Sequence, residues 1–72
     1  MYQITPTQER ILTYIYHYIK IIGYSPTVRE IMEDLGYKSP STVHNQLNAL
    51  QKQGYIDKKK DSPRTIRILK EC

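Results

Sequence analysis

Apolar residues in the first third of the chain recur at helical spacing. They are Ile11, Leu12, Ile15, Tyr18, Ile19 and Ile22. This pattern predicts a long helix with one buried face. Thr5 and Gln8 form a capping box at its start, and Pro6 suits the first helical position, where no N–H is needed. Gly23 follows the last apolar residue and predicts the end of the helix.

A second, shorter helix is predicted to begin after Thr27, which forms another capping box with Glu30. Its apolar face consists of Val28, Ile31, Met32 and Leu35. Gly36 follows that face and can adopt the positive φ that often ends a helix. The chain is therefore expected to turn sharply after about two turns of helix.

A third helix is predicted directly after this turn, because Ser39 offers an N-cap and Pro40 a first helical position. Gly54 is the next helix stop, and the inward stripe is Val43, Leu47 and Leu50. The opposite face carries hydrogen-bonding groups and no carboxylate, at Ser41, His44, Asn45 and Asn48. Such a pair of helices is typical of a helix-turn-helix whose second helix reads DNA, although a plain surface helix in a small bundle fits the same residues.

The apolar spacing changes after Gly54. Residues 55–60 and 65–70 are short segments with β-branched residues, and residues 61–64 have turn chemistry. They predict a β-hairpin whose tip carries Lys58, Lys59, Lys60 and Arg64. The expected fold class is mainly α: a three-helix bundle with a small antiparallel β-hairpin wing, forming one winged helix-turn-helix domain over residues 1–72.

The charge of +4 is concentrated in the second half of the chain. Residues 1–35 hold three basic and four acidic side chains, whereas residues 36–72 hold eight basic and three acidic ones. A positive field around the third helix favours a polyanionic partner. The edge lysines could instead serve solubility or prevent aggregation. The cations expected to contact DNA are Arg29, Lys38, Lys52, Lys58, Lys59, Lys60 and Arg64.

Catalytic chemistry is poorly supported. Ser41 and His44 could touch at i, i+3, but no neighbouring carboxylate would orient the imidazole. His17, His44 and Cys72 lack zinc-site spacing, and there is no glycine-rich phosphate loop. We expect neither an enzyme nor a cofactor. A single cysteine and the absence of a signal or membrane-spanning pattern favour the cytoplasm.

Three elements in this order carry a family resemblance: Pro26-Thr27-x-x-Glu30-Ile31, Leu35-Gly36-x-x-Ser39 and Pro63-Arg64-x-Ile66. With the matching residues around them, the chain resembles the amino-terminal DNA-binding domain of the LexA repressors of the SOS response. The resemblance implies binding to palindromic operators of DNA-damage genes. It also implies that the residues facing bases and adjacent phosphates are Ser39, Ser41, Thr42, His44 and Asn45, with the wing near Lys59 and Lys60 against the backbone.

LexA proteins continue into a self-cleaving serine protease domain that also dimerises, and this sequence stops at Cys72. Self-cleavage is therefore not assigned, and both an excised domain and a stand-alone LexA-like regulator outside the SOS response fit the sequence. We expect a sequence-specific repressor domain, monomeric when free and bound as two copies on a palindrome. The alternative class is a winged helix that docks on another protein, but the neutral recognition face and its basic surroundings favour DNA.

Overall fold

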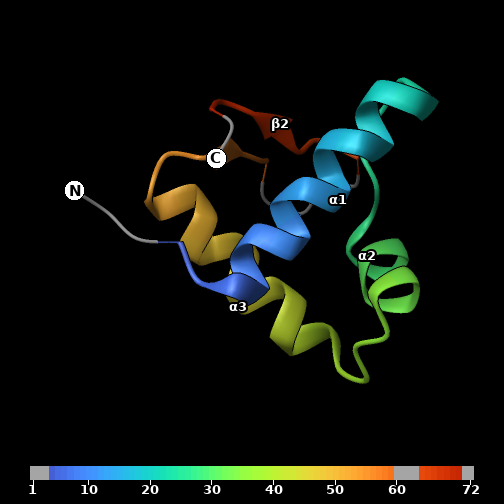
Figure 1. The fold of residues 1–72 in the computed structure, drawn as a ribbon, viewed down its shortest axis with the longest axis vertical. Helices are drawn as coiled ribbons and strands as arrows, with labels where there is room; N and C mark the ends of the chain where they lie inside the picture. Colours follow the sequence, from blue (N-terminus) through green and yellow to red (C-terminus); the bar gives the residue numbers. More distant parts are fainter. Residues whose placement is uncertain (1–3, 60–63, 71–72) are drawn as a thin grey trace.

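The computed structural model describes residues 4–59 and 64–70. It contains three helices, α1 (Pro6–Ile22), α2 (Val28–Leu35) and α3 (Pro40–Lys52), followed by the short strands β1 (Ile56–Asp57) and β2 (Arg67–Ile68). Figure 1 shows α1 crossing the centre of the molecule, with α2 and α3 packed against it and the small sheet beside its far half. This is the predicted three-helix bundle with an antiparallel wing.

The predicted helix starts are confirmed. Thr5 and Thr27 each accept a backbone N–H three residues ahead, from Gln8 and Glu30, at 3.1 Å in both cases. Each capping box is completed by a side-chain oxygen of that Gln or Glu, which accepts from the cap residue's own N–H. The starts of α1 and α2 therefore follow from local sequence chemistry.

The turn between α2 and α3 depends on Gly36, whose φ is 81°. This left-handed conformation lets the Gly36 and Tyr37 N–H groups bond back to the carbonyls of Glu33 and Met32, at 3.4 and 2.9 Å. Ser39 then caps α3 by accepting the N–H of Ser41 at 3.2 Å. The short turn fixes α3 relative to α2, as a helix-turn-helix requires.

One core joins the three helices to the wing. Its buried apolar residues are Ile11, Leu12, Ile15, Ile31, Val43, Leu47, Leu50, Tyr55, Ile56 and Ile66. The predicted inward stripe of α3 is confirmed. On α2 only Ile31 is fully buried, while the other three predicted residues are partly buried against the core. The wing contributes to this core, so it is packed against the bundle.

Two expectations need correction. Ile22 was assigned to the buried stripe but is 47 % exposed, because the last turn of α1 projects beyond α2 and α3 (Figure 1). The strands are also shorter than the predicted segments 55–60 and 65–70. Among the described residues, the strand pairs are Ile56 with Ile68 and Asp57 with Arg67. Side chains interrupt the ladder beyond these pairs, since the Thr65 hydroxyl accepts the Lys59 N–H at 3.0 Å.

Candidate nucleic-acid interface

The outer face of α3 is open to solvent along its length. Ser41, His44, Asn45 and Asn48 are all exposed, as their spacing predicted, and Thr42 is half-buried beside them. Val43 and Leu47 on the opposite side are completely buried. α3 therefore presents hydroxyl, imidazole and amide groups outward from a backbone that the core holds in place. These groups can donate and accept hydrogen bonds to base edges.

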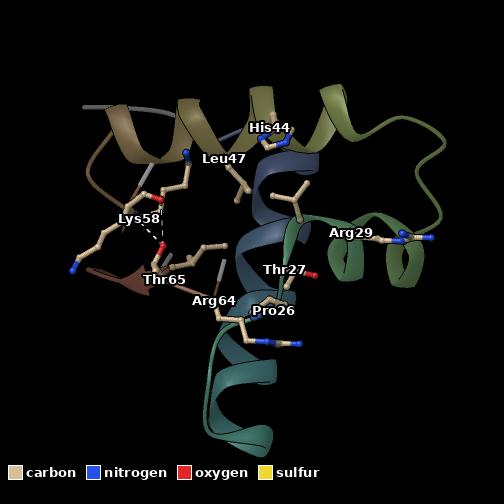
Figure 2. Close-up of a pocket in the computed structure, with 11 residues that line it drawn as sticks. Pro26, Thr27, Arg29, His44, Leu47, Lys58, Arg64 and Thr65 are labelled. Atoms are coloured by element: carbon tan, nitrogen blue, oxygen red, sulfur yellow. Dashed lines mark hydrogen bonds between the residues drawn. The ribbon is translucent and has the colours of Figure 1, made fainter. Parts of the chain in front are cut away.

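A crevice of about 350 Å³ separates α3 from the wing. Its walls include His44 on α3, Arg29 near the start of α2, and Lys58 and Lys59 on the wing, with Leu47 at its base (Figure 2). We call this space the wing crevice. Lys58 and Lys59 line this crevice from the wing, whereas the Arg29 side chain at its edge is directed away along α2 (Figure 2). The two lysines make the crevice suited to a phosphate-rich backbone that lies beside the recognition helix.

The remaining predicted cations are distributed around α3. Lys38 precedes the helix and Lys52 is its last residue, and both are exposed. Arg29 is exposed but forms an ion pair with Glu33, one turn along α2, at 3.2 Å. Lys60 lies outside the described residues. The structure thus brings Lys58 and Lys59 to one crevice, with Arg29 at its edge, and leaves Lys38 and Lys52 at the two ends of the helix.

The wing lysines stand on a braced backbone. The Gln51 side chain donates to the Lys58 carbonyl and to the Asp57 carboxylate, at 3.4 Å each. Arg67 on β2 forms an ion pair with the same Asp57 carboxylate at 3.4 Å. β1 and Lys58, which follows it, are therefore tied both to α3 and to β2.

Arg64 has a partner that the sequence did not indicate. The hairpin pattern predicts a phosphate-binding cation near the tip, and in the structure its guanidinium is directed at α2. Its two terminal nitrogens donate to the Glu30 carboxylate at 3.1 and 3.0 Å, and one of them also donates to the Ser25 carbonyl at 3.1 Å. Arg64 thus forms an intramolecular ion pair with Glu30, a residue far away in the sequence.

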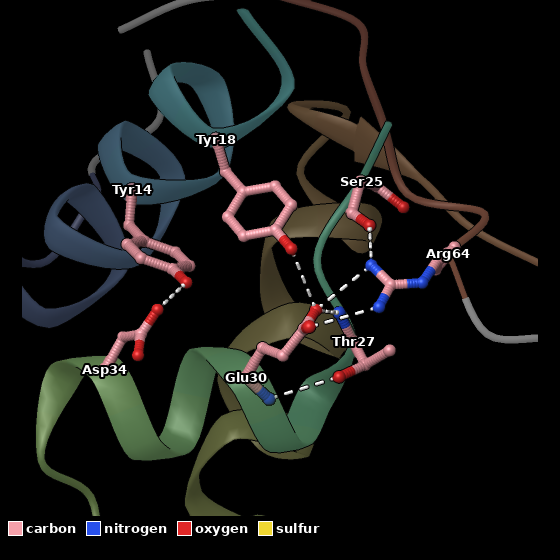
Figure 3. A network of polar contacts seen from close by, with 7 residues as sticks. All are labelled: Tyr14, Tyr18, Ser25, Thr27, Glu30, Asp34 and Arg64. Carbon is pink, nitrogen blue, oxygen red and sulfur yellow. Dashed lines mark hydrogen bonds and ion pairs between the residues drawn. The ribbon is translucent and has the colours of Figure 1, made fainter. Parts of the chain in front are cut away.

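Glu30 is the centre of a polar network that joins α1, α2 and the wing (Figure 3). Its carboxylate accepts the Thr27 N–H at 2.9 Å, the Tyr18 hydroxyl at 3.2 Å and the Arg64 guanidinium. The bond from the Thr27 backbone, followed by that from Arg64, lowers the pKa of Glu30 to about 2. The carboxylate is thus fully ionised at neutral pH and holds Arg64 as a charged pair.

Sequence reasoning missed two parts of this network. Ser25 is only 4 % exposed, and its hydroxyl accepts the backbone N–H of Ile66 at 3.3 Å. Tyr14 donates to Asp34, and burial, followed by this bond, raises the pKa of the Tyr14 phenol. Neither contact has a local signal, because each joins residues 20 or more positions apart. The capping-box pattern predicted only that Glu30 bonds to Thr27 at the start of α2.

Three helices with this turn, an exposed polar face on the third and a basic wing beside it define a winged helix-turn-helix, a class of nucleic-acid-binding domain. The family model described as the LexA DNA binding domain matches residues 1–65. The chain belongs to this family.

Several proteins named LexA repressor are similar in sequence to this chain. The chain is 51 % identical to the LexA repressor of Caldicellulosiruptor saccharolyticus over 93 % of its own length and 33 % of the relative. It is 44 % identical to the LexA repressor of Staphylococcus haemolyticus and 46 % identical to that of Shouchella clausii. These matches cover 99 % and 96 % of this chain, and 34 % and 33 % of the two relatives.

The chain therefore spans about a third of the length of the curated relatives it matches. Within residues 4–59 and 64–70, no helix has the length and apolar character that crossing a membrane requires.

Proposed function

We propose that this domain represses transcription by binding palindromic operators of DNA-damage genes in double-stranded DNA. The observation that carries the proposal is the exposed, carboxylate-free face of α3 next to a crevice lined with Arg29, Lys58 and Lys59. Membership of the LexA DNA-binding domain family and the repressor names of its relatives support the same function. A protein-docking role is not favoured, because the face of α3 is neutral and its surroundings are basic.

In this proposal α3 lies in the major groove. Asn45 and His44 reach base edges one turn into the helix, and the residues that contact neighbouring bases or phosphates are Ser39, Ser41, Thr42 and Asn48. Asn45 suits adenine, since an amide can donate to N7 and accept from N6 of that base. Sequence reading thus rests on short side chains, whose few rotatable bonds limit the entropy lost on binding.

The wing contributes the sequence-independent part of the affinity. Lys58 and Lys59 lie across the crevice from His44 and contact the phosphates that flank the groove. Lys38, Lys52 and Arg29 add to the positive field on the same side, and the charge of Lys60, which lies outside the described residues, is expected to contribute as well. Each phosphate neutralised releases counterions, which makes binding depend steeply on salt.

A single α3 reads only a few base pairs, so a palindrome takes two copies, one on each half-site. The core uses most of the apolar residues of this short chain, which leaves few for a subunit interface. The free protein is therefore a monomer in this proposal. Binding of two copies to one duplex then raises the effective concentration of each for the other and adds modest cooperativity.

Selection from a pool of random duplexes tests the function. Protein-bound DNA is recovered, amplified and sequenced, and an inverted repeat should be enriched. Anisotropy titrations then compare the enriched duplex with a scrambled duplex of the same composition, and the enriched one should bind at least about 10³-fold more tightly. Equal affinity for both duplexes would contradict sequence-specific repression.

A further inference from the structure

The segment that leads into β2, residues 64–66, is bonded to two other parts of the fold. Arg64 donates to the Glu30 carboxylate on α2 and to the Ser25 carbonyl in the loop between α1 and α2 (Figure 3). Two residues later, the Ile66 N–H donates to the Ser25 hydroxyl. Residues 64–66 are therefore held against the helical bundle by both a side chain and the backbone.

The receiving site on the bundle is itself fixed. Glu30 is held by Thr27 and Tyr18, and the Arg64 guanidinium lies over the Tyr24 ring, 4.7 Å from its centroid. A planar guanidinium that bonds a carboxylate through two nitrogens has essentially one orientation. Arg64 also adopts a φ of 57°, an uncommon conformation for a residue with a side chain, which these contacts maintain.

Residues 64–66 also contact the segment after β1 that carries the wing lysines. The Thr65 hydroxyl accepts the Lys59 N–H at 3.0 Å, and Ile66 is buried in the core. Arg64 and Thr65 also line the wing crevice together with Lys58 and Lys59. A shift of Arg64 would therefore move Lys59, which is bonded to Thr65, relative to α3 and would disturb the crevice beside Lys58.

We propose that Arg64 is a positioning residue for DNA binding. It pairs with Glu30 instead of a phosphate and holds the wing where Lys58 and Lys59 can reach the phosphates beside α3. This inference rests on the proposed function, and it gives Glu30 a role beyond capping α2: an acidic residue that increases affinity for a polyanion.

Glu30→Gln is the main test, because a purely electrostatic effect and a loss of wing positioning would change DNA affinity in opposite directions. Loss of a negative charge and release of Arg64 would by themselves tighten binding and steepen its salt dependence. If Arg64 positions the wing, the variant instead binds roughly tenfold more weakly, and the salt slope of log K falls by about 1 to 2. Gln keeps an oxygen that can accept the Thr27 N–H, so the cap of α2 is retained.

The matched control is Glu33→Gln. It makes the same change of charge on the same helix, but the partner of Glu33 is Arg29 on α2 and not a wing residue. This control should bind DNA at least as tightly as the wild type. Arg64→Lys is the second variant, because it keeps the positive charge and loses the two-nitrogen geometry. It should weaken binding as Glu30→Gln does, and it serves if Glu30→Gln fails to fold.

All variants are titrated against the enriched duplex and the scrambled duplex over a range of salt, with circular dichroism confirming that each is folded. Hydrogen exchange at the Lys59 amide provides a readout that does not involve DNA, and it should accelerate in Glu30→Gln and Arg64→Lys. In a Lys58→Ala, Lys59→Ala background, Glu30→Gln should have little further effect on affinity.

Wild-type affinity in both folded variants, or tighter binding by Glu30→Gln, would overturn the positioning role and leave the proposed function intact. Failure of the wild type to bind either duplex would instead overturn the proposed function. An unchanged salt slope of log K in the Lys58→Ala, Lys59→Ala protein would show that the wing lysines do not contact DNA. The positioning role of Arg64 would then be overturned as well.

Discussion

Thr27 and Glu30 hold each other at the start of α2: the Glu30 carboxylate accepts the Thr27 N–H at 2.9 Å, and the Thr27 hydroxyl accepts the Glu30 N–H at 3.1 Å. The first of these bonds, with that from Arg64, keeps the Glu30 carboxylate ionised in the folded protein at pH values where an ordinary glutamate is protonated. Folding is thereby linked to pH through this one side chain.

The sign of that linkage is set by a folded pKa of about 2 against an ordinary value of 4.5. Stability from Glu30 is present above about pH 4.5 and is lost as the pH falls toward 2. In urea titrations over this range, the stability difference between wild type and Glu30→Gln should therefore shrink as the pH is lowered. A difference that stays constant would show that Glu30 is not the linked group.

The core should be sensitive at Ile15 and Leu47, which are both completely buried. Replacement of either by Ala removes apolar contacts and leaves a cavity, at a cost on the order of 2–5 kcal/mol in the free energy of unfolding. Chemical denaturation measures this loss. Ile21→Ala is the control, because Ile21 is 78 % exposed and its loss should have little effect. Near-wild-type stability of Ile15→Ala and Leu47→Ala would contradict the assigned helix faces.

Asn45 should act through base recognition. Asn45→Ala is expected to weaken binding to the enriched duplex by roughly 1–3 kcal/mol and to leave binding to the scrambled duplex nearly unchanged. Anisotropy titrations of both duplexes provide the comparison. Thr13→Ala, an exposed position on α1, is the control and should alter neither affinity. Equal losses on the two duplexes would assign Asn45 to the backbone or to folding.

The wing lysines should act through phosphates. Lys58→Ala or Lys59→Ala is expected to weaken binding to every duplex and to lower the salt slope of log K by about 1 for each lysine that makes a contact. Lys20→Ala makes the same change of charge on α1, outside the wing crevice, and should alter the slope less. If both wing variants kept the wild-type slope, these lysines would serve solubility.

The association state should change only on DNA. Sedimentation of the free protein at micromolar concentration is expected to give a monomer, and the same experiment with an intact palindrome should give two copies per duplex. A duplex with one half-site scrambled should carry one copy. A tight dimer without DNA would point to an interface on the tyrosine-rich first helix.

The success of prediction from sequence depended on the range of the interactions. Capping boxes and helix stops involve neighbours in the chain, so Thr5, Thr27 and Gly36 could be assigned from their types and spacing. The buried face of α3 followed from periodicity in the same way. The role of Arg64 could not be predicted, since its partner lies 34 positions earlier and becomes a neighbour only in the folded state.

The wing shows the same contrast. Alternation of Ile66 and Ile68 predicted a strand, but the length of the ladder depends on which groups take the backbone hydrogen bonds. The Gln51 side chain donates to the Lys58 carbonyl, and the Thr65 hydroxyl accepts the Lys59 N–H. Gln51 lies on α3, and Thr65, although it belongs to the predicted segment 65–70, bonds through its side chain and not its backbone. Strand propensity therefore could not anticipate the two-residue strands.

Tyr55 joins the recognition helix to both strands of the wing. Its N–H donates to the Leu50 carbonyl at 3.0 Å, as Gly54 turns the chain out of α3 with a φ of 85°. Its own carbonyl accepts the N–H groups of Leu69 and Lys70, at 2.8 and 3.3 Å. Helix and wing therefore meet at a junction that is already ordered in the free protein. Association with a duplex loses little conformational entropy there, and more of the contact energy appears as affinity.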